Sequence, residues 1–131
     1  MQISDKELYN IAKETLKYAY APYSKFKVGA ALLTSDGKVF TGVNVENSAY
    51  GAAICAERTA FVKAISEGVL EFSKIAIASS EGSAWPCGIC RQFMYEFNPE
   101  LIVITGDNAD TLESYKLNEL LLNGFRLELQ Q

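Results

Sequence analysis

The sequence predicts an α/β fold of three layers (α/β/α), in which helices cover both faces of a mixed, roughly five-stranded sheet. Three observations lead to this prediction. Apolar residues recur at helical spacing near the N-terminus, two β-prone segments flank an Asp-Gly pair, and helical and β-prone segments alternate after that. Strands joined through a helix are usually parallel whereas a hairpin is antiparallel, so we expect a mixed sheet.

Each expected element is bounded by residues that start or stop a helix or a strand. In chain order the elements are a helix at 5–20, strands at 28–33 and 38–45, a helix at 55–67, a strand at 74–79, a helix at 87–97, a strand at 101–105, a short strand at 114–117 and a short helix at 118–122. The expected order is therefore αββαβαβ, followed by short C-terminal elements.

The first helix and the hairpin have the clearest boundary signals. Ser4 and Glu7 form a capping box, and apolar residues then recur every three or four positions until Pro22. Asp36-Gly37 lies between the first two β-prone segments. This dipeptide predicts an antiparallel hairpin with a two-residue turn.

The later elements are bounded by glycine and proline. The second helix is apolar over much of its surface and stops at Gly68, so we expect it to be buried. The third helix stops before Pro99, and the strands at 74–79 and 101–105 lie on either side of it. After residue 111 the pattern is weaker and supports only one short strand and one short helix.

Composition indicates a single globular domain over residues 1–131. Hydrophobic residues make up 49% of the chain, and no apolar run is long enough to cross a membrane. The polar N-terminal segment lacks the pattern of a signal peptide, so we expect a cytoplasmic protein with reduced cysteines. A net charge of −4 without a basic run argues against nucleic acid as a partner and favours a small-molecule substrate.

Several catalytic classes are excluded by residues that the chain lacks. It contains no histidine, which excludes Ser-His-Asp triads, Cys-His pairs and His-Glu-x-x-His zinc sites. Its nine glycines are too widely spaced for a dinucleotide-binding loop, and the pair at 37 and 42 is not followed by the lysine of a phosphate-binding loop.

Three cysteines, Cys55, Cys87 and Cys90, fall at the starts of the second and third predicted helices. The N-terminus of a helix favours the thiolate, which is the form that binds metal. Three thiolates would fill three of the four positions around zinc and leave one open, as in a catalytic site. Buried core cysteines and a thioredoxin-like redox pair are the alternatives, and a redox pair fits the element order poorly.

Charged residues close to these cysteines suggest further roles. Glu57 lies on a helix that we expect to be buried, and beside a metal-activated water it could accept and pass on a proton. Arg58 and Arg91 lie three and four residues after a cysteine, from where each could donate hydrogen bonds to sulfur and offset the thiolate charge. In a non-catalytic zinc protein, Glu57 or another carboxylate would instead close the fourth position.

Two segments, Cys55-Ala56-Glu57-Arg58 and Pro86-Cys87-Gly88-Ile89-Cys90-Arg91-Gln92, together resemble the signature of the zinc-dependent cytidine deaminases of the short, homotetrameric type. Residues 21–32 and 44–51 resemble further segments of that family, in the family's order. The resemblance implies a cytidine deaminase-like fold and deamination of cytidine and deoxycytidine with release of ammonia, as part of pyrimidine salvage.

The resemblance also implies a role for individual residues. It makes the three cysteines the ligands of one zinc ion per subunit, and Glu57 the proton shuttle to N3 of cytosine and then to the leaving ammonia. Arg58 would temper the thiolate charge. The implied nucleoside contacts are Phe26 against the pyrimidine, the Ala56 backbone at the base, and Asn44 and Glu46 at the ribose hydroxyls.

The family's homotetramers share active sites between subunits, and Tyr50 and Phe125 match positions that reach a neighbouring site. Leu122 stands where the family usually has proline. Without this proline, the position of Phe125 can differ from the family's. A deaminase of another cytosine compound such as blasticidin S, a nucleic-acid editor and a non-catalytic zinc protein are the alternatives. The segment 44–47 favours a free nucleoside, and the acidic charge disfavours an editor.

Overall fold

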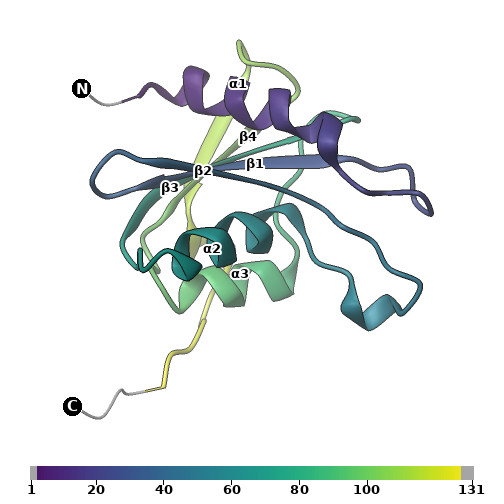
Figure 1. Cartoon of the computed structure of the whole chain (residues 1–131). Coiled ribbons are helices and arrows are strands. Elements are labelled where there is room, and N and C mark those ends of the chain that lie inside the picture. The colour runs from purple at the N-terminus through teal and green to yellow at the C-terminus, as the bar shows by residue number, and fades with distance from the viewer. Residues whose placement is uncertain (1–2, 128–131) are drawn as a thin grey trace.

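The structure, a computed structural model, describes residues 3–127, and within them five strands form one sheet with helices on both faces (Figure 1). The predicted three-layer fold and element order are confirmed. The elements are α1 Asp5–Thr15, η1 Leu16–Tyr18, β1 Val28–Thr34, β2 Val39–Val43, η2 Tyr50–Ala52, α2 Ala56–Ser66, β3 Phe72–Ser79, α3 Gly88–Tyr95, β4 Ile102–Gly106, β5 Leu112–Lys116 and α4 Leu117–Leu120, where η denotes a 3₁₀ helix. Among these residues, no helix is both long and apolar enough to span a membrane.

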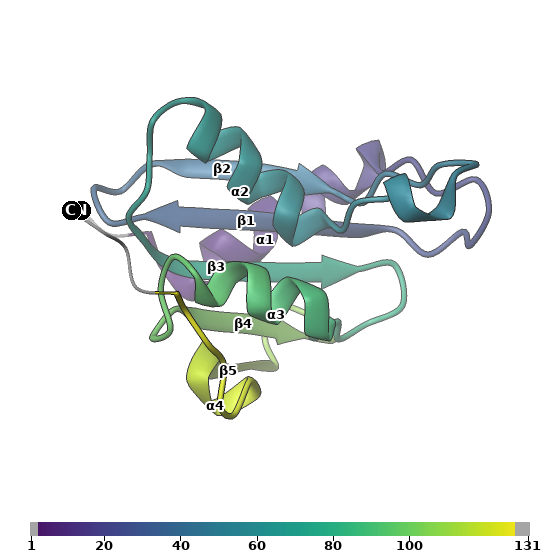
Figure 2. The same cartoon turned by 90° about the horizontal axis from the view of Figure 1, so that it is seen from below.

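The sheet is mixed, in the order β2-β1-β3-β4-β5. The hairpin strands β1 and β2 are antiparallel, as predicted, and β1 also pairs antiparallel with β3. β3 and β4, which α3 connects, are parallel, and β5 returns antiparallel to β4. The path from β1 through β2 and α2 to β3 therefore lays α2 across one face, next to α3 (Figure 2).

The β1–β2 turn differs from the two-residue turn predicted at Asp36-Gly37. The Thr34 N–H donates to the Lys38 carbonyl at 2.8 Å, so the loop contains three residues, 35–37. The Gly37 N–H donates to the Thr34 carbonyl at 3.1 Å, and Gly37 has a φ of 95°. A type I turn followed by a glycine at positive φ is the common three-residue solution, and it uses the same dipeptide one position later.

The helices α1 and α3 end earlier than predicted because their last turns tighten. α1 stops at Thr15 and continues as the 3₁₀ helix η1 to Tyr18, where the prediction extended to residue 20. α3 stops at Tyr95 instead of residue 97, and the N–H groups of the next turn both donate to the Met94 carbonyl. Such shortened turns satisfy the last carbonyls of a helix.

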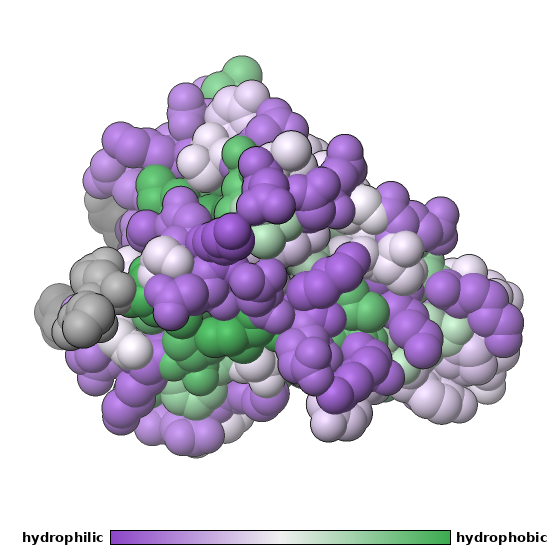
Figure 3. All heavy atoms as spheres, turned by 90° about the horizontal axis from the view of Figure 1, so that it is seen from above, coloured by the Kyte–Doolittle hydropathy of each residue, from purple (hydrophilic) through white to green (hydrophobic). Residues whose placement is uncertain are grey.

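The core lies in two layers, one on each face of the sheet. Alternate residues of β1 point to opposite faces: Ala31 and Leu33 pack against α1, while Ala30 and Leu32 pack under α2 and α3. Figure 3 shows the face that carries α1 as largely hydrophilic, with apolar side chains gathered in patches. The face under α2 and α3 is the one that positions the candidate site.

Two glycines let the helices lie directly on the sheet. A Cβ at Gly29 would come within 2.2 Å of the Ala12 carbonyl oxygen of α1. On the other face, a Cβ at Gly42 would lie 2.4 Å from both the Ala56 carbonyl oxygen and the Ala60 nitrogen. The first turn of α2 is therefore seated against the backbone of β2.

Candidate metal centre

The N-termini of α2 and α3 bring the three cysteines together. Cys55 and Cys87 are the N-cap residues of these helices, and Cys90 lies in the first turn of α3. Their sulfur atoms all lie within 4.8 Å of one another. A single ion whose bonds to sulfur are about 2.3 Å long could bind all three thiols. Zinc suits this cluster, because thiolates are soft ligands.

Neither N-cap cysteine uses its side chain to cap its helix within the described residues. The Cys55 and Cys87 carbonyls accept the first helical hydrogen bonds, at 3.0 Å from the Thr59 N–H and 2.9 Å from the Arg91 N–H. The remaining N–H groups of each first turn stay available to the negative charge of a thiolate. The starts of both helices therefore present N–H groups to the cluster in which the sequence predicted metal ligands.

The thiols are polarised by one another and by Arg58. A hydrogen bond from Cys90, assisted by Arg58, lowers the pKa of Cys55 to about 5 against the effect of burial. The same hydrogen bond, together with burial, raises the pKa of Cys90. Arg58 Nη2 donates to Cys55 Sγ at 3.8 Å, as predicted from the spacing, and its buried Nε has no partner among residues 3–127. The cluster thus holds negative charge beside a fixed cation.

Glu57 is the buried acid of the site, with only 5% of its surface exposed. Burial raises the pKa of Glu57 to about 7. A carboxyl group with such a pKa can both accept and donate a proton near neutral pH. Its position in the first turn of α2 follows from the packing of that helix on β2.

A cavity of about 200 Å³ opens beside the cysteines, and it contains six of the residues singled out from the sequence. Its lining comes from the start of β1, the end of β2, the start of α2, strand β3 and the segment before α3. The predicted residues that line it are Phe26, Asn44, Cys55, Ala56, Glu57 and Cys87.

Asn44 has a structural task in this cavity that the sequence did not reveal. Its Oδ1 accepts from the Val28 N–H at 2.9 Å, and its Nδ2 donates to the Phe26 carbonyl at 2.8 Å. The amide therefore ties the end of β2 to the start of β1. The bond to the Phe26 carbonyl fixes the backbone of a residue that lines the cavity.

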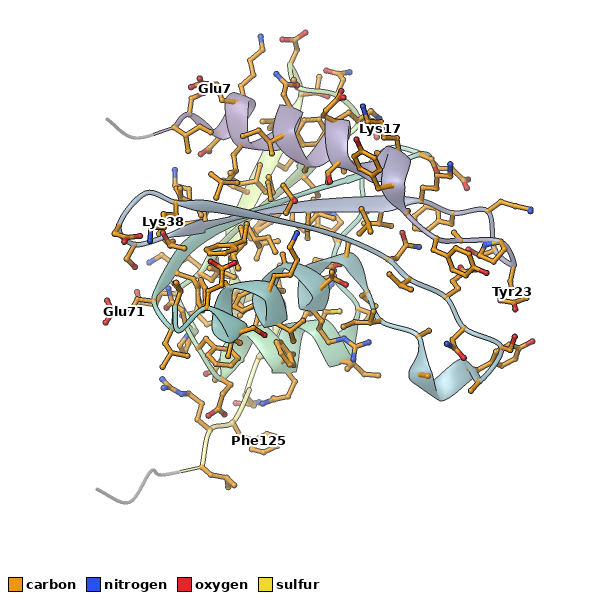
Figure 4. All side chains as sticks on the ribbon, in the orientation of Figure 1. Glu7, Lys17, Tyr23, Lys38, Glu71 and Phe125 are labelled. Carbon is orange, nitrogen blue, oxygen red and sulfur yellow. The ribbon has the colours of Figure 1, made fainter. Side chains whose placement is uncertain are left out.

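The other predicted nucleoside contacts lie elsewhere in the isolated chain. Glu46 and Tyr50 line a separate hollow of about 430 Å³. There the Glu46 carboxylate accepts from the backbone N–H groups of Tyr23 at 3.0 Å and Ser24 at 3.1 Å. Phe125 is 63% exposed and extends from the chain beyond α3 (Figure 4).

The family model for the cytidine and deoxycytidylate deaminase zinc-binding region matches residues 2–105. The chain belongs to this family. A probable cytidine deaminase of Dictyostelium discoideum is 52% identical over 105 residues, covering 79% of this chain and 71% of that protein. A cytidine deaminase of Sporosarcina psychrophila is 46% identical over 119 residues, covering 89% and 88%. The crystal structure of cytidine deaminase from Burkholderia pseudomallei has a TM-score of 0.88 at 44% identity and covers 94% of this chain and 100% of that chain.

Membership of this zinc-dependent deaminase family decides between the alternatives left open by the cysteine spacing. A thioredoxin-like redox pair and buried core cysteines do not explain a match to a zinc-binding region that includes all three cysteines. The deaminase family also accounts for the mixed sheet with helices on both faces, which its solved members share.

The prediction that Arg91 donates a hydrogen bond to sulfur is wrong. Its Nε donates to the Pro86 carbonyl at 2.7 Å and its Nη1 to the Leu120 carbonyl at 2.6 Å. The spacing of four residues from Cys87 permits contact with the thiol, but α4 places a second carbonyl within reach. The guanidinium bridges the two carbonyls instead.

Four further residues of the deaminase cavity were not predicted. Thr105, which is fully buried on β4, bonds to two of them: its Oγ1 accepts from the Ala84 N–H at 3.0 Å and donates to the Ile77 carbonyl at 2.8 Å. Only the Trp85-Pro86 pair just before a cysteine could have drawn attention to this segment. The additional lining residues are Val28, Ile77, Ala84 and Trp85.

Proposed function

We propose that this chain is a zinc-dependent cytidine deaminase that hydrolyses cytidine and deoxycytidine to uridine and deoxyuridine with release of ammonia. The observation that carries the proposal is the meeting of three thiols and a buried glutamate at one cavity. Membership of the deaminase family and relatives named cytidine deaminase support the same reaction. One zinc ion per subunit is the required cofactor.

The cysteines and Arg58 prepare the site. Cys55, Cys87 and Cys90 would hold the zinc ion, which when bound supplies the Lewis acidity that brings the pKa of a water molecule toward neutrality. Three thiolates weaken that acidity, and the hydrogen bond from Arg58 to Cys55 offsets part of their charge.

Glu57 moves the protons of the reaction. Its carboxylate takes a proton from the attacking water and delivers it to N3 of cytosine as the C4–O bond forms. It then carries the second proton of that water to the amino group, which leaves as ammonia when the C4–N bond breaks. The raised pKa of Glu57 suits a group that accepts and donates in turn.

We propose that the base occupies the cysteine cavity while the ribose extends toward Glu46. The cavity, about 200 Å³, is smaller than the pockets of about 300–1,000 Å³ that hold drug-sized ligands. Phe26 would pack on the pyrimidine, the Ala56 backbone would contact the base, and Asn44 would meet the sugar. Glu46 has to exchange its contacts with Tyr23 and Ser24 for ribose hydroxyls.

We further propose that residues 1–131 act as one catalytic domain within a cytoplasmic homotetramer that shares its active sites between subunits. Residues 1–2 and 128–131 of that domain lie outside the described part. Tyr50 and Phe125, which the resemblance places near a neighbouring site, are 85% and 63% exposed in the single chain. Large exposed aromatic side chains favour burial against a partner.

The direct test is ammonia release by the purified protein incubated with cytidine, with blasticidin S and free cytosine run alongside and zinc measured in the same sample. We expect release with cytidine, and with deoxycytidine assayed in the same way, but not with blasticidin S or free cytosine. Release from blasticidin S alone would move the chain to a different deaminase substrate. A protein that contains zinc but releases no ammonia from any of these would support a non-catalytic zinc protein.

A further inference from the structure

We propose that Arg91 is a positioning residue for the metal centre, which holds the Pro86–Cys87 peptide so that the Cys87 thiol faces the other two cysteines. The inference rests on the proposed zinc site and adds a residue that acts on it without touching the ion. The observation that carries it is the hydrogen bond from Arg91 Nε to the Pro86 carbonyl, 2.7 Å long, which holds the peptide group directly before Cys87.

Cys87 needs such support more than the other helix-capping cysteine does. Cys55 follows Ile54, which is fixed by two backbone hydrogen bonds to Val45, each 3.0 Å long. Cys87 is exposed and follows a proline, which has no N–H to donate. The segment before it is held by Thr105 as far as Ala84. The bond from Arg91 extends that hold to the residue adjoining the ligand.

The Arg91 guanidinium makes a second hydrogen bond, to α4, which fixes its orientation. Its Nη1 donates to the carbonyl of Leu120, the last residue of α4, at 2.6 Å. The planar guanidinium can bond two carbonyls at fixed angles, whereas a lysine amine in its place offers a single flexible point charge. Arg91 therefore differs in role from Arg58: Arg91 bonds to two backbone carbonyls, whereas Arg58 bonds to the Cys55 sulfur.

The neighbouring residue provides a matched control. Gln92 Nε2 donates to the Phe125 carbonyl at 2.8 Å, so it also ties α3 to the C-terminal segment. Within residues 3–127, its side chain makes no hydrogen bond to Pro86 or Leu120. Replacing Gln92 loosens the same segment without releasing the peptide before Cys87.

The experiment measures how fast zinc leaves the full-length, zinc-loaded protein for a chelating dye, in the absence of substrate. The variants are Arg91→Ala, Arg91→Lys and the control Gln92→Ala. We expect both Arg91 variants to lose zinc about tenfold to a hundredfold faster than the parent, which is the usual effect of removing a residue that orients a metal ligand. Gln92→Ala should match the parent, and thermal unfolding of the zinc-free proteins should be alike.

Each other outcome overturns the proposal. Zinc release at the parent rate in Arg91→Lys, with fast release in Arg91→Ala, would mean that only the positive charge matters. Parent rates in both would leave Arg91 without a role at the metal. Equal loss in Gln92→Ala, or lower zinc-free stability in the Arg91 variants, would assign the effect to docking of the C-terminal segment. Since no substrate is used, a parent that holds zinc but does not deaminate cytidine refutes the proposed function alone.

Discussion

At the scale of single residues, the site depends on a buried carboxyl group and three clustered thiols, and burial and neighbouring groups shift the pKa values of Glu57, Cys55 and Cys90. Glu57 is buried, and burial raises its pKa to about 7. The carboxyl group can therefore exchange a proton near neutral pH. The cysteines occupy helix starts whose N–H groups no thiol caps within the described residues. Burial of an ionised acid lowers stability, so a buried glutamate beside a cluster of thiols indicates a role in the reaction.

We expect Glu57→Gln to lower kcat for cytidine by a factor of about 10²–10⁴, since this is what a positioned acid–base group contributes. Zinc content should stay at one ion per chain, because the amide is close in size and is not a ligand. Turnover and bound zinc are measured on the same preparation. If zinc is lost together with activity, Glu57 is a fourth ligand and the site is closed.

We expect Arg58→Ala to keep its zinc and to react more slowly, by about tenfold to a hundredfold in kcat. Loss of the bond from Arg58 to Cys55 leaves more charge on the thiolates and weakens the metal's effect on water. Steady-state rates and zinc analysis are the measurements. Unchanged turnover would reduce Arg58 to a packing residue.

At the scale of elements, the sequence predicted the order of helices and strands, because helical spacing and helix starts are local properties, whereas the meeting of Cys55 with Cys87 and Cys90 was implied by the family resemblance. It did not predict the bonds of Arg91, because their geometry depends on α4, some thirty positions further along the chain. The separation of Glu46 from the cavity follows likewise from contacts with Tyr23 and Ser24 across two loops. Local pattern fails where the partner comes from a distant segment.

Substitutions at two glycines test whether the metal site depends on the close packing of α2 on β2. Gly42 lies under α2, and Gly29 lies under α1 on the opposite face. Gly42→Ala and Gly29→Ala each force a helix off the sheet, and overpacking of this kind costs about 1–3 kcal/mol. We expect both to lower the unfolding midpoint in denaturant. Only Gly42→Ala should also speed zinc loss, because it displaces the turn that carries Cys55 and Glu57.

Gly51→Ala is the matched control for this pair, since nothing lies within 4 Å of the added Cβ. It should leave both stability and zinc loss unchanged. Equal zinc loss in Gly29→Ala and Gly42→Ala would show that the metal site responds to global stability and not to the seating of α2.

At the scale of the whole molecule, the predicted nucleoside contacts do not meet in one cavity of the single chain. The cysteine cavity holds one part of the predicted contacts, and the hollow with Glu46 and Tyr50 lies apart from it. Phe125 reaches neither in the described chain, and it extends away from the sheet (Figure 4). In the proposed tetramer a neighbouring subunit would supply the missing side chains.

Mixed assemblies of two inactive variants test this sharing. Chains with Glu57→Gln keep Phe125, and chains with Phe125→Ala keep Glu57, so a site built from both chains contains both groups. We expect each variant alone to be impaired, and co-expressed, differently tagged chains purified through both tags to regain cytidine turnover. Recovery requires a neighbour's Phe125 at the site that contains Glu57. If the purified mixed assembly is no more active than the variants alone, Phe125 serves its own chain, and the leucine at 122 has changed the family's arrangement.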